Sequence, residues 1–74
     1  MKLSELKIGE SAKIISVNTA LALKKRLNYM GLIDGVKVTV VRFSPFGDPI
    51  EIKLRDFMMA VRKTDASKII VEKV

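Results

Sequence analysis

The feature that most constrains the fold is the alternation of apolar and polar residues in the middle of the chain. Residues 36–43 read VKVTVVRF, and residues 50–55 read IEIKLR. A period of two places the apolar side chains of each segment on one face of a β-sheet. The alternation slips at Val40 and Val41, which predicts a β-bulge or a sharp bend. This part of the chain should therefore form strands that share one buried face.

Shorter alternating segments flank this pair and complete the expected set of strands. The expected strands cover residues 12–17, 36–43, 50–55, 57–62 and 69–72. In the first of them, Ala12, Ile14 and Ser16 share one side. We expect a tight turn at Asp56 and a capped single turn over residues 64–67. All five strands are short, as in small β-proteins.

One helix is expected between the first two strands. Its apolar face is formed by Ala20, Leu23, Leu27 and Met30, at spacings of three, four and three. This spacing matches one side of an α-helix. Asn18 and Thr19 are suitable N-terminal caps, and Gly31 suits a left-handed residue that ends the helix.

This order of elements predicts a mainly β fold for residues 1–74 as a single domain. Five strands in so short a chain must avoid long open edges, and a curled sheet solves that problem. We expect a small SH3-like barrel of about five strands with one helix inserted after the first strand. A five-stranded OB-fold is the competing architecture, but it would place its helix between the third and fourth strands.

The chain contains no cysteine and no histidine. Their absence removes thiolate metal sites, cysteine nucleophiles and the commonest general base near neutral pH. Asp48, Glu51 and Asp56 could gather into a carboxylate cluster, but their positions in turns and on a polar strand face favour structural or solvated roles. We therefore expect a protein that is not an enzyme, with no catalytic residue, no cofactor and no metal site of its own.

The net charge of +6 favours an anionic partner, such as an acidic protein surface, nucleic acid or the inner face of a membrane. Lys24, Lys25 and Arg26 fall on the outer face of the expected helix. They form either a docking patch or an ordinary solvated face. No apolar segment is long enough to span a membrane, so we expect a cytoplasmic protein.

Aromatic residues are too few to favour nucleic acid as the main partner. Proteins that bind single strands without sequence preference combine a basic groove with aromatic side chains on which bases stack. Strand phase places Phe43 and Phe57 in the core, which leaves Tyr29 and Phe46 exposed. Phe46 stands at the tip of residues 44–49 (SPFGDP), where it either projects toward a partner or folds back onto the barrel.

The order of three motifs closely resembles the FeoA family. They are LxxLxxGxxA from residue 3, RLxxMGLxxG from residue 26 and PxGDPI from residue 45. The likeness continues through residues 60–62 (AVR) and 65–66 (DA) and covers essentially the whole chain. Met30 stands where the family usually has leucine, and Asp56 stands where it often has glycine, which affects only the detail of one hairpin.

This resemblance implies an SH3-like barrel that works in iron transport, in a family associated with ferrous iron and transition-metal ion binding. The implied role is that of a small cytoplasmic accessory protein at the inner face of the cytoplasmic membrane. It would bind and modulate FeoB, a membrane transporter for ferrous iron that carries a GTP-binding domain. Because this chain lacks Cys and His, we expect it to contribute through contacts with the transporter.

Exposure on the helix and the loop predicts six partner-binding residues: Lys24, Lys25, Arg26, Tyr29, Phe46 and Asp48. The alternative function is that of a basic small barrel that binds nucleic acid or resembles a metal regulator. Two further contacts stay open, a homo-oligomer formed through an uncovered strand edge and a peripheral contact with an anionic membrane surface.

Overall fold

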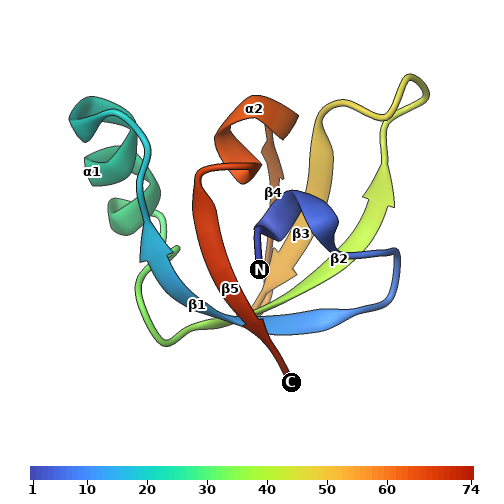
Figure 1. Ribbon diagram of the computed structural model, residues 1–74, viewed down its shortest axis with the longest axis horizontal. Helices are drawn as coiled ribbons and strands as arrows, with labels where there is room; N and C mark the ends of the chain where they lie inside the picture. Colours follow the sequence, from blue (N-terminus) through green and yellow to red (C-terminus); the bar gives the residue numbers. More distant parts are fainter.

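Five strands form one antiparallel sheet in the spatial order β4-β3-β2-β1-β5 (Figure 1). The structure, a computed structural model, describes residues 1–74. The strands are β1 (Ser11–Val17), β2 (Lys37–Phe43), β3 (Ile50–Leu54), β4 (Phe57–Val61) and β5 (Ile69–Lys73). The helical elements are the 3₁₀ helix η1 (Leu3–Glu5) and the α-helices α1 (Leu21–Tyr29) and α2 (Lys63–Ala66). The prediction of a mainly β fold of about five strands, with a helix after the first, is confirmed.

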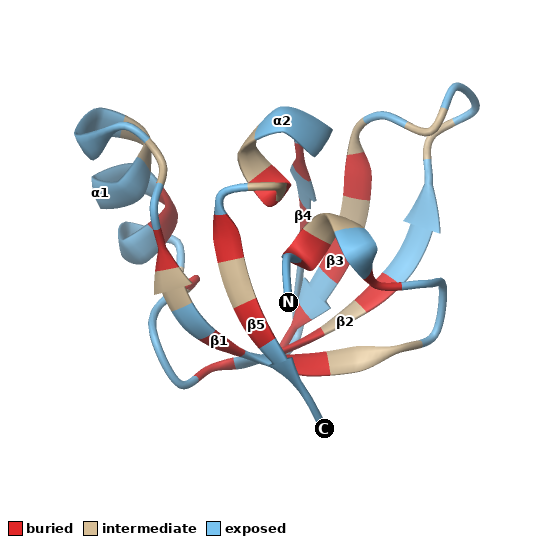
Figure 2. Cartoon of the chain, viewed as in Figure 1, coloured by how far each residue is buried: buried red, intermediate tan, exposed pale blue.

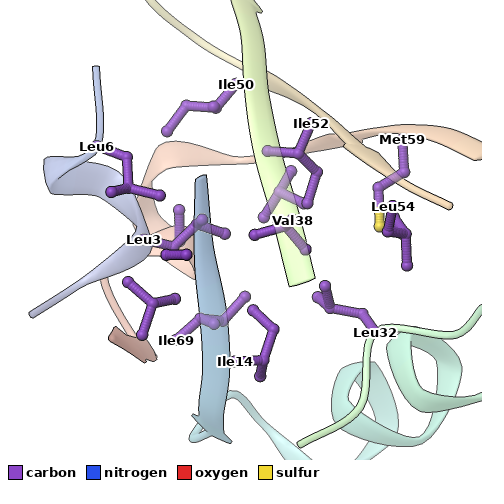
Figure 3. Packing of buried hydrophobic residues seen from close by; sticks show 14 of the residues in the cluster. Leu3, Leu6, Ile14, Leu32, Val38, Ile50, Ile52, Leu54, Met59 and Ile69 are labelled. Carbon is purple, nitrogen blue, oxygen red and sulfur yellow. The ribbon is translucent and has the colours of Figure 1, made fainter. Parts of the chain in front are cut away.

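The curled sheet encloses a single apolar core (Figure 2). All 18 buried residues are hydrophobic, so the core contains no polar side chain that needs a partner. In β3 the buried side chains alternate with polar ones, as the period of two requires. Figure 3 shows Leu3 from the N-terminal segment packing among residues of several strands, such as Ile14 and Ile69. The N-terminal segment therefore closes one end of the barrel.

Two β-bulges bend the sheet. One lies between Val40 and Arg42, as the slip in alternation predicts. The other lies between Ile14 and Ser16 and was not predicted. Because of this extra residue, Val17 faces the core, and the prediction that Ser16 shares the side of Ile14 is wrong.

Helix α1 differs from its prediction at its start and along its apolar face. Its N-cap residue is Ala20, with no side-chain cap. Asn18 and Thr19 do not cap it, because the Asn18 amide donates to the Ser16 hydroxyl and the Thr19 hydroxyl donates to the Ala20 carbonyl. Of the four predicted face residues only Leu27 is buried and Leu23 partly so, whereas Ala20 and Met30 are exposed. The helix therefore rests on the barrel mainly through Leu27.

Gly31 ends α1 as predicted, with a φ of +103° in the left-handed region. The expected single turn after β4 is also present, as α2. No helix in the structure is long and apolar enough to cross a membrane.

Phe43 and Phe57 are not core residues, and that prediction is wrong. Their side chains are 37% and 43% exposed. Phe43 is the last residue of β2 and Phe57 the first residue of β4, so both lie where the sheet ends and little packs over them. Strand phase gives the side of the sheet that a residue faces but not whether that side is covered there.

Candidate functional site

The structure places the six predicted partner-binding residues on the surface in two separate groups. The helix group is Lys24, Lys25, Arg26 and Tyr29 on α1, and the loop group is Phe46 and Asp48 between β2 and β3. All six are exposed. Figure 1 shows α1 and this loop on opposite sides of α2. The two groups therefore do not form one continuous patch.

The helix group combines positive charge with an exposed ring. The Tyr29 side chain is 93% exposed and stands at the C-terminal end of α1. None of Lys24, Lys25 and Arg26 forms an ion pair, because the two ion pairs of the molecule are Arg42–Glu51 and Lys73–Glu10. This side of α1 is therefore free to attract an acidic partner.

The loop between β2 and β3 holds Phe46 away from the barrel. The Gly47 amide donates to the Ser44 carbonyl at 2.7 Å, and the Ser44 amide donates to the Pro49 carbonyl at 3.1 Å. The Phe46 side chain is 99% exposed. Of the two alternatives for this residue, the outward position is the one observed.

Asp48 has a structural contact that sequence reasoning missed. Its Oδ1 accepts a hydrogen bond of 2.8 Å from the backbone amide of Lys63, the first residue of α2. The N-cap residue of α2, Arg62, makes no side-chain cap. Asp48 therefore supplies the missing cap from another part of the chain and ties the loop to α2.

A small groove between α1 and β4 is the feature nearest to the helix group, and sequence reasoning missed it too. Its volume is about 120 Å³. It is lined by Leu23, Arg26, Leu27, Met30, Met59, Ala60, Val61, Arg62 and Asp65. Most of these side chains are apolar, and the three charged ones come from α1 and the start and body of α2. Arg26 connects the predicted helix group to this groove.

Carboxylates do not converge in the structure. Asp48 caps α2, Glu51 pairs with Arg42 at 2.9 Å, and Asp56 lies in the β3–β4 turn. No group of three Asp or Glu side chains is placed to hold a metal ion. Glu10 pairs with Lys73 and also accepts the Lys7 amide, and these hydrogen bonds hold the pKa of its carboxyl below the ordinary value of 4.5. Asp48, Glu51 and Glu10 therefore act in local structural contacts.

The FeoA domain family model matches residues 1–73. The chain is 39% identical over 72 residues to the "Fe(2+) transport protein A/Fe(2+) transporter FeoB fusion protein" of Porphyromonas gingivalis. That match covers 97% of this chain but only 8% of the fusion protein. Sequence outside the matched region therefore makes up most of that relative.

Solved structures of FeoA proteins share the fold. The FeoA protein of Chlorobium tepidum is 42% identical, with a TM-score of 0.97 over 100% of this chain and 70% of that one. The FeoA of Stenotrophomonas maltophilia, described as a prokaryotic SH3-domain protein and solved in complex with zinc, is 30% identical. Its TM-score is 0.81, and the match covers 97% of this chain and 89% of that one. The predicted SH3-like architecture is confirmed by this likeness.

Proposed function

This chain belongs to the FeoA family, and from this we propose that it serves ferrous iron transport by binding a FeoB-type membrane transporter and modulating it. The observation that carries the proposal is the Porphyromonas gingivalis relative, in which the matching region and a FeoB transporter are parts of one protein. Covalent fusion keeps two parts at a high effective concentration. A free chain with the same fold would have to reach its transporter through a docking surface.

The groove between α1 and β4 is the docking surface that we assign to the transporter. Its apolar lining offers a place for one or two apolar side chains, and such contacts dominate protein interfaces. Arg26, Arg62 and Asp65 line the groove, and none of them forms an ion pair, so the groove keeps an excess of positive charge. The occupant is therefore a transporter segment that carries apolar residues and a carboxylate. Lys24, Lys25 and Tyr29 extend this surface along α1, and the loop group makes a second contact.

The chain contributes through contact rather than by carrying the metal. It has no His or Cys, so the imidazole nitrogen and thiolate sulfur ligands that suit Fe²⁺ and Zn²⁺ are missing. No three carboxylates converge either. The zinc complex belongs to the Stenotrophomonas maltophilia protein. Ferrous iron is the cargo of the transporter, and no step of the proposed role passes through a metal bound to this chain.

The proposed place of action is the cytoplasmic side of the membrane, beside the transporter and its GTP-binding domain. A net charge of +6 supports this, because Lys and Arg near an anionic leaflet contribute about 1 kcal/mol each to membrane association. A contact with the membrane surface would add to the protein contact and would not replace it.

Ferrous iron uptake in cells that lack this protein tests the proposal. Uptake should fall on deletion while the transporter is still made, and wild type should restore it. The double variant Arg26→Glu and Arg62→Glu should fail to restore it, because both groove charges are reversed. The control Lys7→Glu and Lys68→Glu changes net charge equally at exposed sites outside the groove. Full restoration by the groove variant would contradict the assignment of this surface.

A nucleic-acid role predicts a different result. Binding to single-stranded DNA would weaken steeply as salt rises. Fluorescence anisotropy at two salt concentrations separates this alternative from docking on a protein, and light scattering separates it from self-association through an uncovered strand edge.

A further inference from the structure

Positive charge without acidic partners gathers on the outer face of the sheet, away from α1. Lys13 of β1 lies directly opposite Lys37 of β2, and Thr39 of β2 lies directly opposite Lys53 of β3. Arg55 lies in the turn directly after β3. Like charges placed directly opposite one another destabilise a sheet. The sequence nonetheless places Lys13 and Lys37 directly opposite one another, with Lys53 on the neighbouring strand.

Three of these side chains line an open depression on the surface. Lys37, Lys53 and Arg55 line it together with Thr39, Val36 and Gly35, and its volume is about 550 Å³. We call this feature the basic depression. The Thr39 hydroxyl is held in place by a 2.7 Å hydrogen bond with the Ser11 hydroxyl. Only Val36 is hydrophobic, so the lining suits a polar, negatively charged ligand and offers no apolar wall for an acyl chain or a base.

Nearby carboxylates do not neutralise the basic depression. Glu51 lies on the same strand as Lys53, but it pairs with Arg42 at 2.9 Å. Glu72 lies opposite Lys13 in the β1–β5 register, yet it forms no ion pair within 4 Å. No ion pair includes Lys37, Lys53 or Arg55. The charge on this face is therefore available to a ligand.

Arg55 also has an unusual backbone conformation. Its φ of +56° makes it the only non-glycine residue with a positive φ. Arg55 is the first residue of the two-residue turn between β3 and β4, and tight hairpin turns require a positive φ at this position. A non-glycine residue in this region costs about 1–2 kcal/mol. Glycine would relieve the strain but would also remove the guanidinium group from the depression. Arg55, the residue with this unfavourable backbone conformation, is thus the one whose guanidinium can bind an anion through two parallel hydrogen bonds.

We propose that the basic depression binds a phosphate group with two or more negative charges, such as a phosphate monoester or a diphosphate. Two ammonium groups and one guanidinium line the space together with Thr39, whose hydroxyl shares a hydrogen bond with the Ser11 hydroxyl. A compact group with two or more negative charges can pair with three cations at once, which separate carboxylates do less well. This site shares no residue with the groove, so it is independent of the proposed docking on the transporter.

Titration of the full chain with inorganic pyrophosphate, followed by ¹H–¹⁵N NMR, tests the site. We expect the largest shifts at the amides of Thr39, Lys53 and Arg55. The triple variant Lys37→Gln, Lys53→Gln, Arg55→Gln should bind about tenfold more weakly or worse, because charge-assisted hydrogen bonds are lost. Its spectrum also reports whether it is folded, and Arg55→Gln alone gives a milder second variant with a smaller loss.

The control variant Lys7→Gln, Lys63→Gln, Lys68→Gln removes the same charge at exposed positions elsewhere. It should keep its affinity for pyrophosphate within about twofold, since distant surface charges are screened. Equal weakening of both triple variants would overturn the proposal, because the binding would then be general charge attraction. Shifts centred on α1, or a glutamate peptide that occupies the site where pyrophosphate does not, would also overturn it.

Vesicles identify the source of the phosphate. Co-sedimentation of wild type, but not of the triple variant, with vesicles of phosphatidic acid in phosphatidylcholine would assign the site to a lipid headgroup. Pyrophosphate binding without such co-sedimentation would assign it to a free phosphorylated compound. Vesicles of phosphatidylcholine alone give the baseline.

Discussion

At the scale of single residues, Arg55 shows how one position can trade stability for a surface charge. Its positive φ is unfavourable for a residue with a Cβ atom. We predict that Arg55→Gly has a free energy of unfolding about 0.5 to 1 kcal/mol higher than Arg55→Gln. The glutamine variant also lacks the charge but keeps the Cβ, so the comparison isolates the backbone. Urea unfolding measures both.

Equal stability of these two Arg55 variants would contradict the prediction. It would mean that the hairpin adapts to a side chain at this position without cost. Arg62→Gly serves as a further check, because Arg62 has an ordinary φ of −59° and glycine should bring no gain there.

Asp48 carries both a structural and a proposed binding role, and two substitutions separate them. Asp48→Ala removes the acceptor for the Lys63 amide, so we predict a loss of about 1 kcal/mol in the free energy of unfolding. Asp48→Asn keeps an acceptor oxygen but removes the charge, and it should retain most of the stability. Asp56→Ala, in an exposed turn, is the control. If Asn and Ala were equally destabilising, the hydrogen bond to α2 would not be the cause.

At the scale of elements, α1 packs on the rest of the fold through few buried side chains. It has nine residues, and only Leu27 among them is buried. Helices this short are marginal by themselves and depend on packing. We predict that amides in the middle of α1 exchange with deuterium faster than those of Val38 and Ile52 in the central strands. Hydrogen exchange followed by NMR measures this, and equal protection in α1 and the sheet would contradict it.

The elements that could be predicted from the sequence are those whose pattern is local. The strands at 36–43 and 50–55 follow from their period of two. The end of the helix follows from Gly31, which suits a left-handed residue. The bulge after Ile14 was missed, although the adjacent apolar residues Ile14 and Ile15 break the alternation there as Val40 and Val41 do in β2. The exposure of Phe43 and Phe57 depends on where the sheet ends, which is set by tertiary structure.

The candidate site was less predictable than the fold. Exposure of Lys24, Lys25 and Arg26 follows from helix phase. The groove, by contrast, needs α1, β4 and α2 to meet, and no local pattern contains that information. The contact between Asp48 and the Lys63 amide joins positions fifteen residues apart, so no local pattern predicts it either. To predict the basic depression, the register of β2 and β3 would have to be known, because this register places Thr39 opposite Lys53.

At the scale of the whole molecule, the chain presents two distinct surfaces around one apolar core. The groove beside α1 combines apolar lining with two unpaired arginines, and the basic depression is almost entirely polar. They lie on different elements and suit different partners. A protein of 74 residues could therefore contact a transporter on one surface and a phosphate-bearing ligand on the other.

The most direct test of the central claim is an affinity pull-down of the tagged chain from detergent-solubilised membranes of its own, iron-limited cells, with identification by mass spectrometry. We predict that wild type recovers the FeoB-type transporter. Two variants should lose it: Arg26→Glu with Arg62→Glu, and alanine at all six predicted contact residues. Recovery of the transporter unchanged by both variants would contradict the assigned surface, and recovery of only nucleic-acid-associated proteins or of the chain itself would contradict the docking role.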